Sequence, residues 1–141
     1  MISRKIMRGI LAITLGLIAY FILLTAITGL FEIAFGGKQK SLDLIISLSA
    51  FSFSSMLAGY VVQEKGSLIG LLLSVSVIAL ILIGWGYLLN LPHEKIFDIL
   101  GSQRGIVFEF MGYIAAGLLF GHVGGFIQKY FATKKQKQHD I

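Results

Sequence analysis

The distribution of charged and apolar positions divides the chain into four long apolar runs. Residues 9–31, 44–63, 66–92 and 110–128 contain no Asp, Glu, Lys or Arg. A helix needs about 20 residues to cross the hydrocarbon core of a bilayer, and each run is close to that length or longer. The pattern therefore predicts transmembrane helices over about 9–31, 42–62, 67–89 and 106–131.

The segments between these runs predict how the helices are connected. A glycine-rich polar loop begins at Gly36, and the four residues 63–66 (Gln-Glu-Lys-Gly) form a turn too short for anything but a hairpin. After Pro92, apolar and charged residues alternate in a way typical of a short helix on the membrane surface, at about 92–100. We expect an all-α membrane protein: one domain of four antiparallel transmembrane helices, with an interfacial helix between the third and fourth.

Composition and charge support this class and add an orientation. The 141 residues are 56% hydrophobic and 13% charged, against about 25% charged in soluble chains, so no soluble domain is expected. The net charge of +5 comes from residues that flank the apolar runs, which favours the lipid bilayer over nucleic acid as the partner. The two tails and the 63–66 turn carry more Lys and Arg residues than the connections on the other side of the membrane. This difference predicts cytoplasmic termini in a plasma (inner) membrane.

Small residues recur at helical spacing and predict close helix packing. They are Gly117, Gly121 and Gly125 in the last run, Gly66, Gly70 and Ser74 in the third, and Ser54 and Ala58 in the second. Such strips let helix backbones approach closely in lipid. They could join the helices of one bundle, or face a second copy in a homo-oligomer or a larger membrane complex, and the spacing alone leaves both readings open.

His122 is the only His, Asp, Glu, Lys or Arg deep inside an apolar run. Intramembrane ionisable groups are costly and often functional. A neutral histidine can also be satisfied by one hydroxyl, for instance a serine of residues 42–62. The alternatives are a proton or ion relay in a small oligomeric transporter or channel, and an axial ligand to a pigment or haem; no cofactor is predicted. Glu109 lies about 20 Å away along a helix and is no partner.

The chain carries no recognisable catalytic signature. It has no cysteine, no H-E-x-x-H, no phosphate-binding G-x-x-x-x-G-K-[ST] and no G-x-S-x-G. We therefore expect no enzyme, no catalytic residues and no metal site. The leading interpretation is a structural or accessory membrane subunit that packs through its small-residue faces.

The segment Ala58-Gly59-Tyr60, followed by Lys65 and the Gly66-x-x-x-Gly70 spacing, resembles small four-helix bacterial membrane proteins of uncharacterised function. The glycine-rich last run extends that resemblance to the whole layout. The resemblance implies a prokaryotic plasma-membrane protein. It implies no site residues.

Overall fold

The computed structural model describes residues 3–36, 40–62, 64–88, 90, 92, 94, 95, 98 and 104–139. The regular secondary structure of these residues is entirely helical, and four of the helices are long and apolar enough to cross a membrane. The helices are α1 (Arg4–Phe35), α2 (Lys40–Val62), α3 (Gly66–Leu88) and α5 (Arg104–His139). This is the expected class of a multi-pass membrane protein. Most of the predicted interfacial helix at 92–100 lies outside the described residues.

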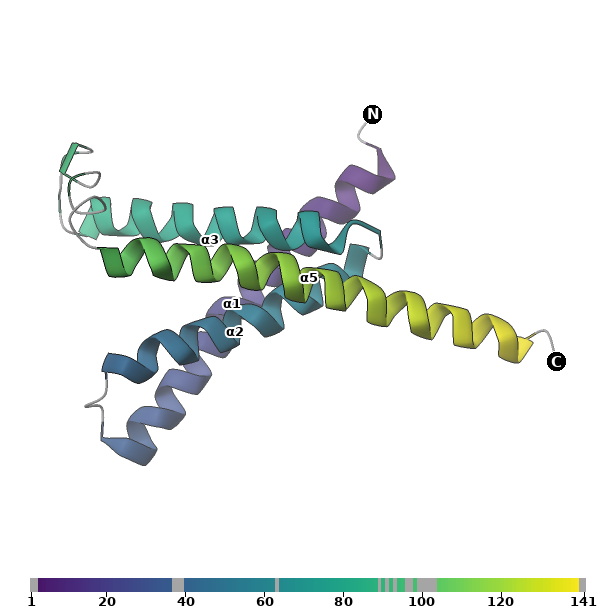
Figure 1. Cartoon of the computed structure of the whole chain (residues 1–141), viewed down its shortest axis with the longest axis horizontal. Helices are drawn as coiled ribbons and strands as arrows, with labels where there is room; N and C mark the ends of the chain where they lie inside the picture. Colours follow the sequence, from purple (N-terminus) through teal and green to yellow (C-terminus); the bar gives the residue numbers. More distant parts are fainter. Residues whose placement is uncertain are drawn as a thin grey trace.

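The helices form two crossed pairs (Figure 1). α3 and α5 run side by side, and α1 and α2 cross them obliquely, so that the second half of α2 and the first half of α3 meet α1 and α5 at the crossing. α5 packs mainly against α2 and α3, whereas α1 packs mainly against α2. The N-terminus, the α2–α3 turn and the C-terminus all lie towards the right-hand side of Figure 1.

Two helices are longer than their apolar runs predict. α1 begins at Arg4 rather than at residue 9. The Ser3 hydroxyl, directly before Arg4, accepts a hydrogen bond from the Lys5 backbone N–H and acts as an N-cap. The helix ends at Phe35 and is capped by Gly36, whose φ of 68° is left-handed and whose N–H donates to the Glu32 carbonyl, a common glycine stop. α5 continues past residue 131 to His139. Charged residues favour water but do not end a helix, so a hydropathy boundary underestimates both lengths.

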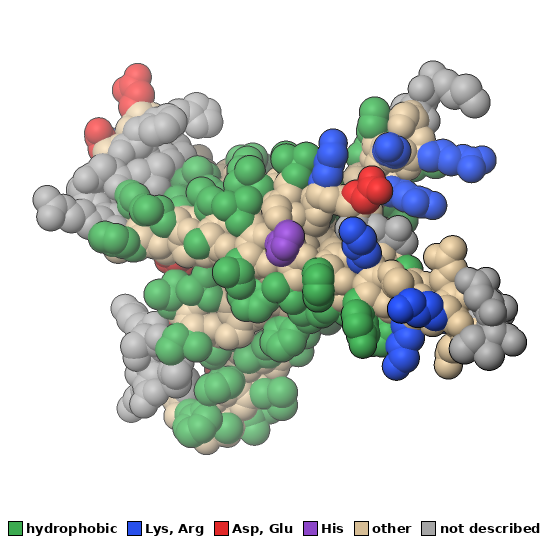
Figure 2. Space-filling model, turned by 45° about the vertical axis from the view of Figure 1, so that its right-hand side comes forward, with side chains coloured by type: hydrophobic (Ala, Val, Ile, Leu, Met, Phe, Trp, Pro, Cys, Tyr) green, Lys and Arg blue, Asp and Glu red, His purple; other side chains and the backbone are tan. Residues whose placement is uncertain are grey.

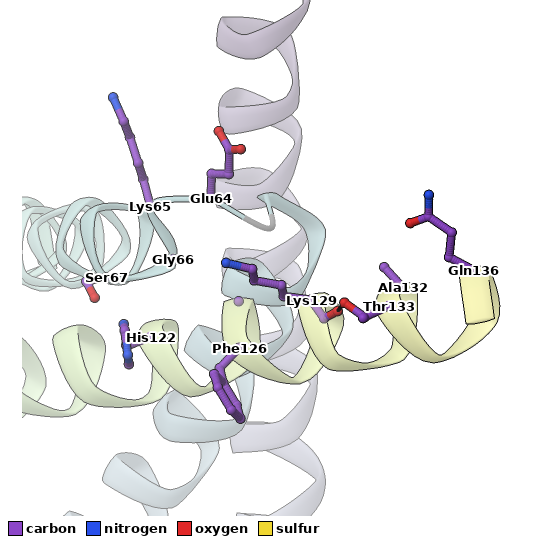
Figure 3. Close-up of a pocket in the computed structure, with 11 residues that line it drawn as sticks. Glu64, Lys65, Gly66, Ser67, His122, Phe126, Lys129, Ala132, Thr133 and Gln136 are labelled. Carbon is purple, nitrogen blue, oxygen red and sulfur yellow. Dashed lines mark hydrogen bonds between the residues drawn. The ribbon is translucent and has the colours of Figure 1, made fainter.

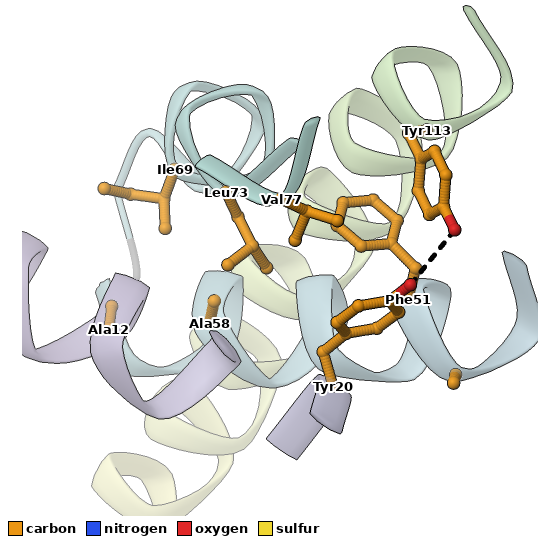
Figure 4. Packing of buried hydrophobic residues seen from close by; sticks show 9 residues of the cluster. Ala12, Tyr20, Phe51, Ala58, Ile69, Leu73, Val77 and Tyr113 are labelled. Carbon is orange, nitrogen blue, oxygen red and sulfur yellow. Dashed lines mark hydrogen bonds between the residues drawn. The ribbon is translucent and has the colours of Figure 1, made fainter. Parts of the chain in front are cut away.

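A small apolar core lies where the four helices cross (Figure 4). Its buried members are Ala12, Tyr20, Ala50, Phe51, Ala58, Ile69, Leu73, Val77 and Tyr113. The rings of Phe51 and Tyr113 meet edge to face with centroids 5.0 Å apart, a favoured aromatic geometry. Outside this crossing the helices present apolar side chains outward, such as Ile22, Ile33 and Phe108, as lipid-facing helices do.

Candidate functional site

Three groups of residues are candidates for a functional site: the small residues between α2, α3 and α5, the hydroxyls near the crossing, and the surroundings of His122. The first group brings helix backbones into direct contact. A Cβ added to Gly70 would collide with the Gly117 carbonyl oxygen, and one added to Gly121 would collide with that of Gly66. In the same way Gly59 faces the Gly121 carbonyl, and Gly124 faces that of Met56. We call this contact the glycine seam.

The structure places each small residue predicted from the sequence inside the protein. Gly66, Gly70, Gly117, Gly121 and Gly125 are all buried. An added Cβ at Gly66 would lie 3.4 Å from the Gly125 backbone nitrogen. The strip of the last helix therefore meets α2 and α3 of its own chain, which answers the question that its spacing left open.

Buried serines reinforce the seam by bonding to backbone carbonyls. The Ser74 hydroxyl lies 2.8 Å from the Gly70 carbonyl of its own helix and 2.9 Å from the Tyr113 carbonyl of α5. Ser55 donates across from α2 to the Gly117 carbonyl over 3.0 Å. Ser54 donates only within α2, to Ala50. Ala58 is buried where α1 crosses, 3.2 Å from the position of a Cβ added to Gly16.

The second group is a triangle of hydroxyls from three helices. The Tyr20 hydroxyl of α1 lies 2.9 Å from Ser47 of α2 and 3.0 Å from the Tyr113 hydroxyl of α5, and Ser47 and Tyr113 also hydrogen-bond to each other. Each hydroxyl can donate one proton and accept another, so all three are satisfied without water. We call this set the hydroxyl triangle.

Sequence reasoning missed the triangle. Its available signal was the position of Tyr20 and Tyr113 inside apolar runs, because a buried tyrosine hydroxyl usually finds a partner. A second signal was the helical spacing that puts Ser47 on one face with Ser54 and Ala58, two of the small residues predicted to pack. Nothing in the spacing indicated which helix would meet which.

The third group surrounds His122, which is exposed rather than buried. It lines a groove of about 480 Å³ between the start of α3 and the second half of α5. This groove has no serine of α2 among its described lining residues. Figure 3 shows the His122 ring directed towards Ser67 of α3, with Lys129 extending from α5 towards the α2–α3 turn. The imidazole thus faces α3 and the open side of the groove, and Ser67 of α3 is the hydroxyl nearest to it in this view.

The described residues bring no three His, Asp or Glu side chains together as a set of metal ligands. Comparison with known proteins adds nothing to the geometry: no family model, no curated protein and no solved structure matches this chain.

Proposed function

We propose that the chain is a non-enzymatic accessory subunit of a bacterial plasma membrane, an antiparallel bundle with both termini in the cytoplasm and a short interfacial helix at 92–100. The observation that carries the proposal is how the interior polar groups are used. The hydroxyls of Ser54, Ser55, Ser74 and the hydroxyl triangle each bond to a carbonyl or to one another. A bundle whose inner polar groups hold its helices together is suited to a structural role.

The charge distribution supports the proposed orientation. Figure 2 shows Lys and Arg side chains gathered at one end of the visible face. The exposed basic residues of the two tails and the α2–α3 turn belong to this end: Arg4, Lys5, Arg8, Lys65, Lys129, Lys134, Lys135 and Lys137. Basic residues are retained on the cytoplasmic side during membrane insertion.

The proposed role requires a contact with another protein, either a second copy or a larger complex, through a surface other than the glycine seam. α1 offers the best one, because Gly29 has nothing within 4 Å of an added Cβ and Thr25 and Ala26 beside it are exposed. A small, outward face of this kind allows close approach of another helix.

Gly29→Leu tests this contact without touching the packed interior. We expect the mass measured by native mass spectrometry from nanodiscs to fall from that of an assembly towards the single chain, with the helix content by circular dichroism unchanged. Gly84→Leu is the matched control, since Gly84 also has open space around it but lies on α3. A wild-type protein that is always a single chain with no bound protein would overturn the proposal.

The alternatives of a transporter or channel and of a pigment-binding subunit both depend on His122. Its place in an open groove, away from the hydroxyl triangle, favours neither a relay through the bundle nor an enclosed ligand site. Ion flux into liposomes that is lost in His122→Ala would support a transporter or channel. A visible absorption spectrum of the purified protein would support a pigment-binding subunit.

A further inference from the structure

The groove beside His122 collects side chains that donate hydrogen bonds or carry positive charge. Lys65 and Lys129 supply two ammonium groups, Ser67 a hydroxyl and His122 a ring N–H, all among the residues lining this groove. Glu64 is the only acid in that lining; its carboxylate and the Lys65 side chain both point away from α5 in Figure 3, whereas Lys129 extends from α5 towards the α2–α3 turn. The electrostatic balance of the groove therefore favours an anion.

The local backbone adds to this preference. Lys65 precedes the first residue of α3 in a left-handed conformation, with φ of 65°. The lysine side chain has no acceptor that could cap the backbone N–H groups at the start of α3, and the first turn of α3 contains no acidic residue. The partial positive charge of the helix start is thus not neutralised by its own first turn, and it acts in the same direction as the two lysines.

The groove also lies where the apolar part of α5 ends. The charge-free run closes at residue 128 and Lys129 follows it directly, while Phe126, another lining residue, is 65% exposed. A ligand here would meet cations at one side and an apolar surface at the other. Phospholipids at a membrane boundary present this combination, with a phosphate at the level of the lysines and acyl chains beside the apolar helix.

We propose that this groove binds the phosphate of an anionic phospholipid, with Lys129 pairing with its charge, Ser67 and His122 as further hydrogen-bond donors, and Lys65 adding positive charge at the α2–α3 turn. The acyl chains lie along the apolar surface at Phe126. The site goes beyond the proposed accessory role and does not depend on it, since lipid binding needs no second protein.

The test compares two double variants by native mass spectrometry in mild detergent, with phosphatidylglycerol or phosphatidylcholine added at equal concentrations. Lys65→Gln with Lys129→Gln removes both groove charges. Lys134→Gln with Lys135→Gln removes the same charge from exposed positions of α5 outside the groove lining. A lysine near an anionic headgroup contributes about fivefold in affinity, so we expect the groove variant to lose at least about tenfold in phosphatidylglycerol affinity and the tail variant to stay near wild type.

Two further arms make the outcome decisive. Lys129→Arg keeps the charge and should retain binding, which separates loss of a contact from loss of the fold. Inorganic phosphate, titrated at millimolar concentration and followed by the NMR signals of the His122 ring, distinguishes a soluble ligand from a lipid. Equal binding of the two lipids by the wild type, equal losses in the two double variants, or groove-dependent binding of phosphate without any lipid preference would each overturn the proposal.

Discussion

Gly117→Ala is the sharpest test of the glycine seam, because one methyl group must fit between α3 and α5. Its Cβ would overlap the Ser74 hydroxyl and the Gly70 carbonyl oxygen, and would lie 3.0 Å from the Gly70 carbonyl carbon. Neither backbone atom can move alone. The methyl group therefore requires the two helices to separate or the Ser74 side chain to rotate away.

The magnitude follows from these two responses. Overpacking a well-packed interior costs about 1–3 kcal/mol. Losing the Ser74 hydrogen bond to the Tyr113 carbonyl adds about 0.6 kcal/mol, the average for interhelical bonds in a membrane. Alanine recovers up to about 1 kcal/mol through its higher helix propensity. We expect the free energy of unfolding to fall by about 1–3 kcal/mol.

Gly84→Ala is the matched control, since nothing lies within 4 Å of an added Cβ there. This variant gains helix propensity without steric overlap, so its free energy of unfolding should equal or exceed that of the wild type. The free energy of unfolding can be measured by titrating folded protein in mixed micelles with sodium dodecyl sulfate and following circular dichroism. Adding Ser74→Ala to Gly117→Ala should restore part of the loss, because one of the overlapping atoms is then absent. Equal stabilities for the position 117 and position 84 variants would refute the reasoning.

Two further substitutions test other features. Tyr113→Phe removes one hydroxyl of the triangle and leaves Tyr20 and Ser47 with each other; we expect a loss of about 0.6–1.7 kcal/mol in the same titration. Phe51→Leu, which removes no hydroxyl but shortens a ring packed on Tyr20 and Tyr113, serves as a packing comparison. No change in Tyr113→Phe would show that the triangle does not hold the helices together. Lys65→Gly relieves a left-handed backbone at φ of 65°. It should raise the thermal unfolding midpoint in lipid-free detergent by an amount equivalent to about 1 kcal/mol, and a lower midpoint would contradict the strain argument.

The sequence predicts the four spanning helices well because their signal is local. Uncharged runs as long as 66–92 strongly indicate membrane-spanning helices. The tight turn after Val62 follows because only a few residues separate two such runs. The glycine spacing likewise predicted close approach at Gly117 and Gly121. These features depend on one helix at a time.

Features that combine several helices were not predictable in the same way. In a soluble protein the apolar stripe of a helix marks its inner face, but lipid is as apolar as a core, so hydropathy does not distinguish the buried Leu73 from the exposed Leu72. The partners of Tyr20 therefore could not be deduced, and the spacing did not indicate that His122 lies opposite the start of α3. The groove combines the α2–α3 turn with residues some 60 positions later, a pairing that only the fold reveals.

The hydroxyl triangle has a consequence for the order in which the protein is made. Ribosomes deliver Tyr20 and Ser47 to the membrane before Tyr113, so the first hairpin is inserted while one hydroxyl proton still lacks its final acceptor. When α5 arrives, the Tyr113 hydroxyl completes the hydroxyl triangle. Its hydrogen bonds favour docking of α5 against α1 and α2 over other positions in the bilayer. A chain interrupted before α5 would keep that donor without its acceptor, so the pairing of α1 with α2 would lack the contact that the complete bundle supplies.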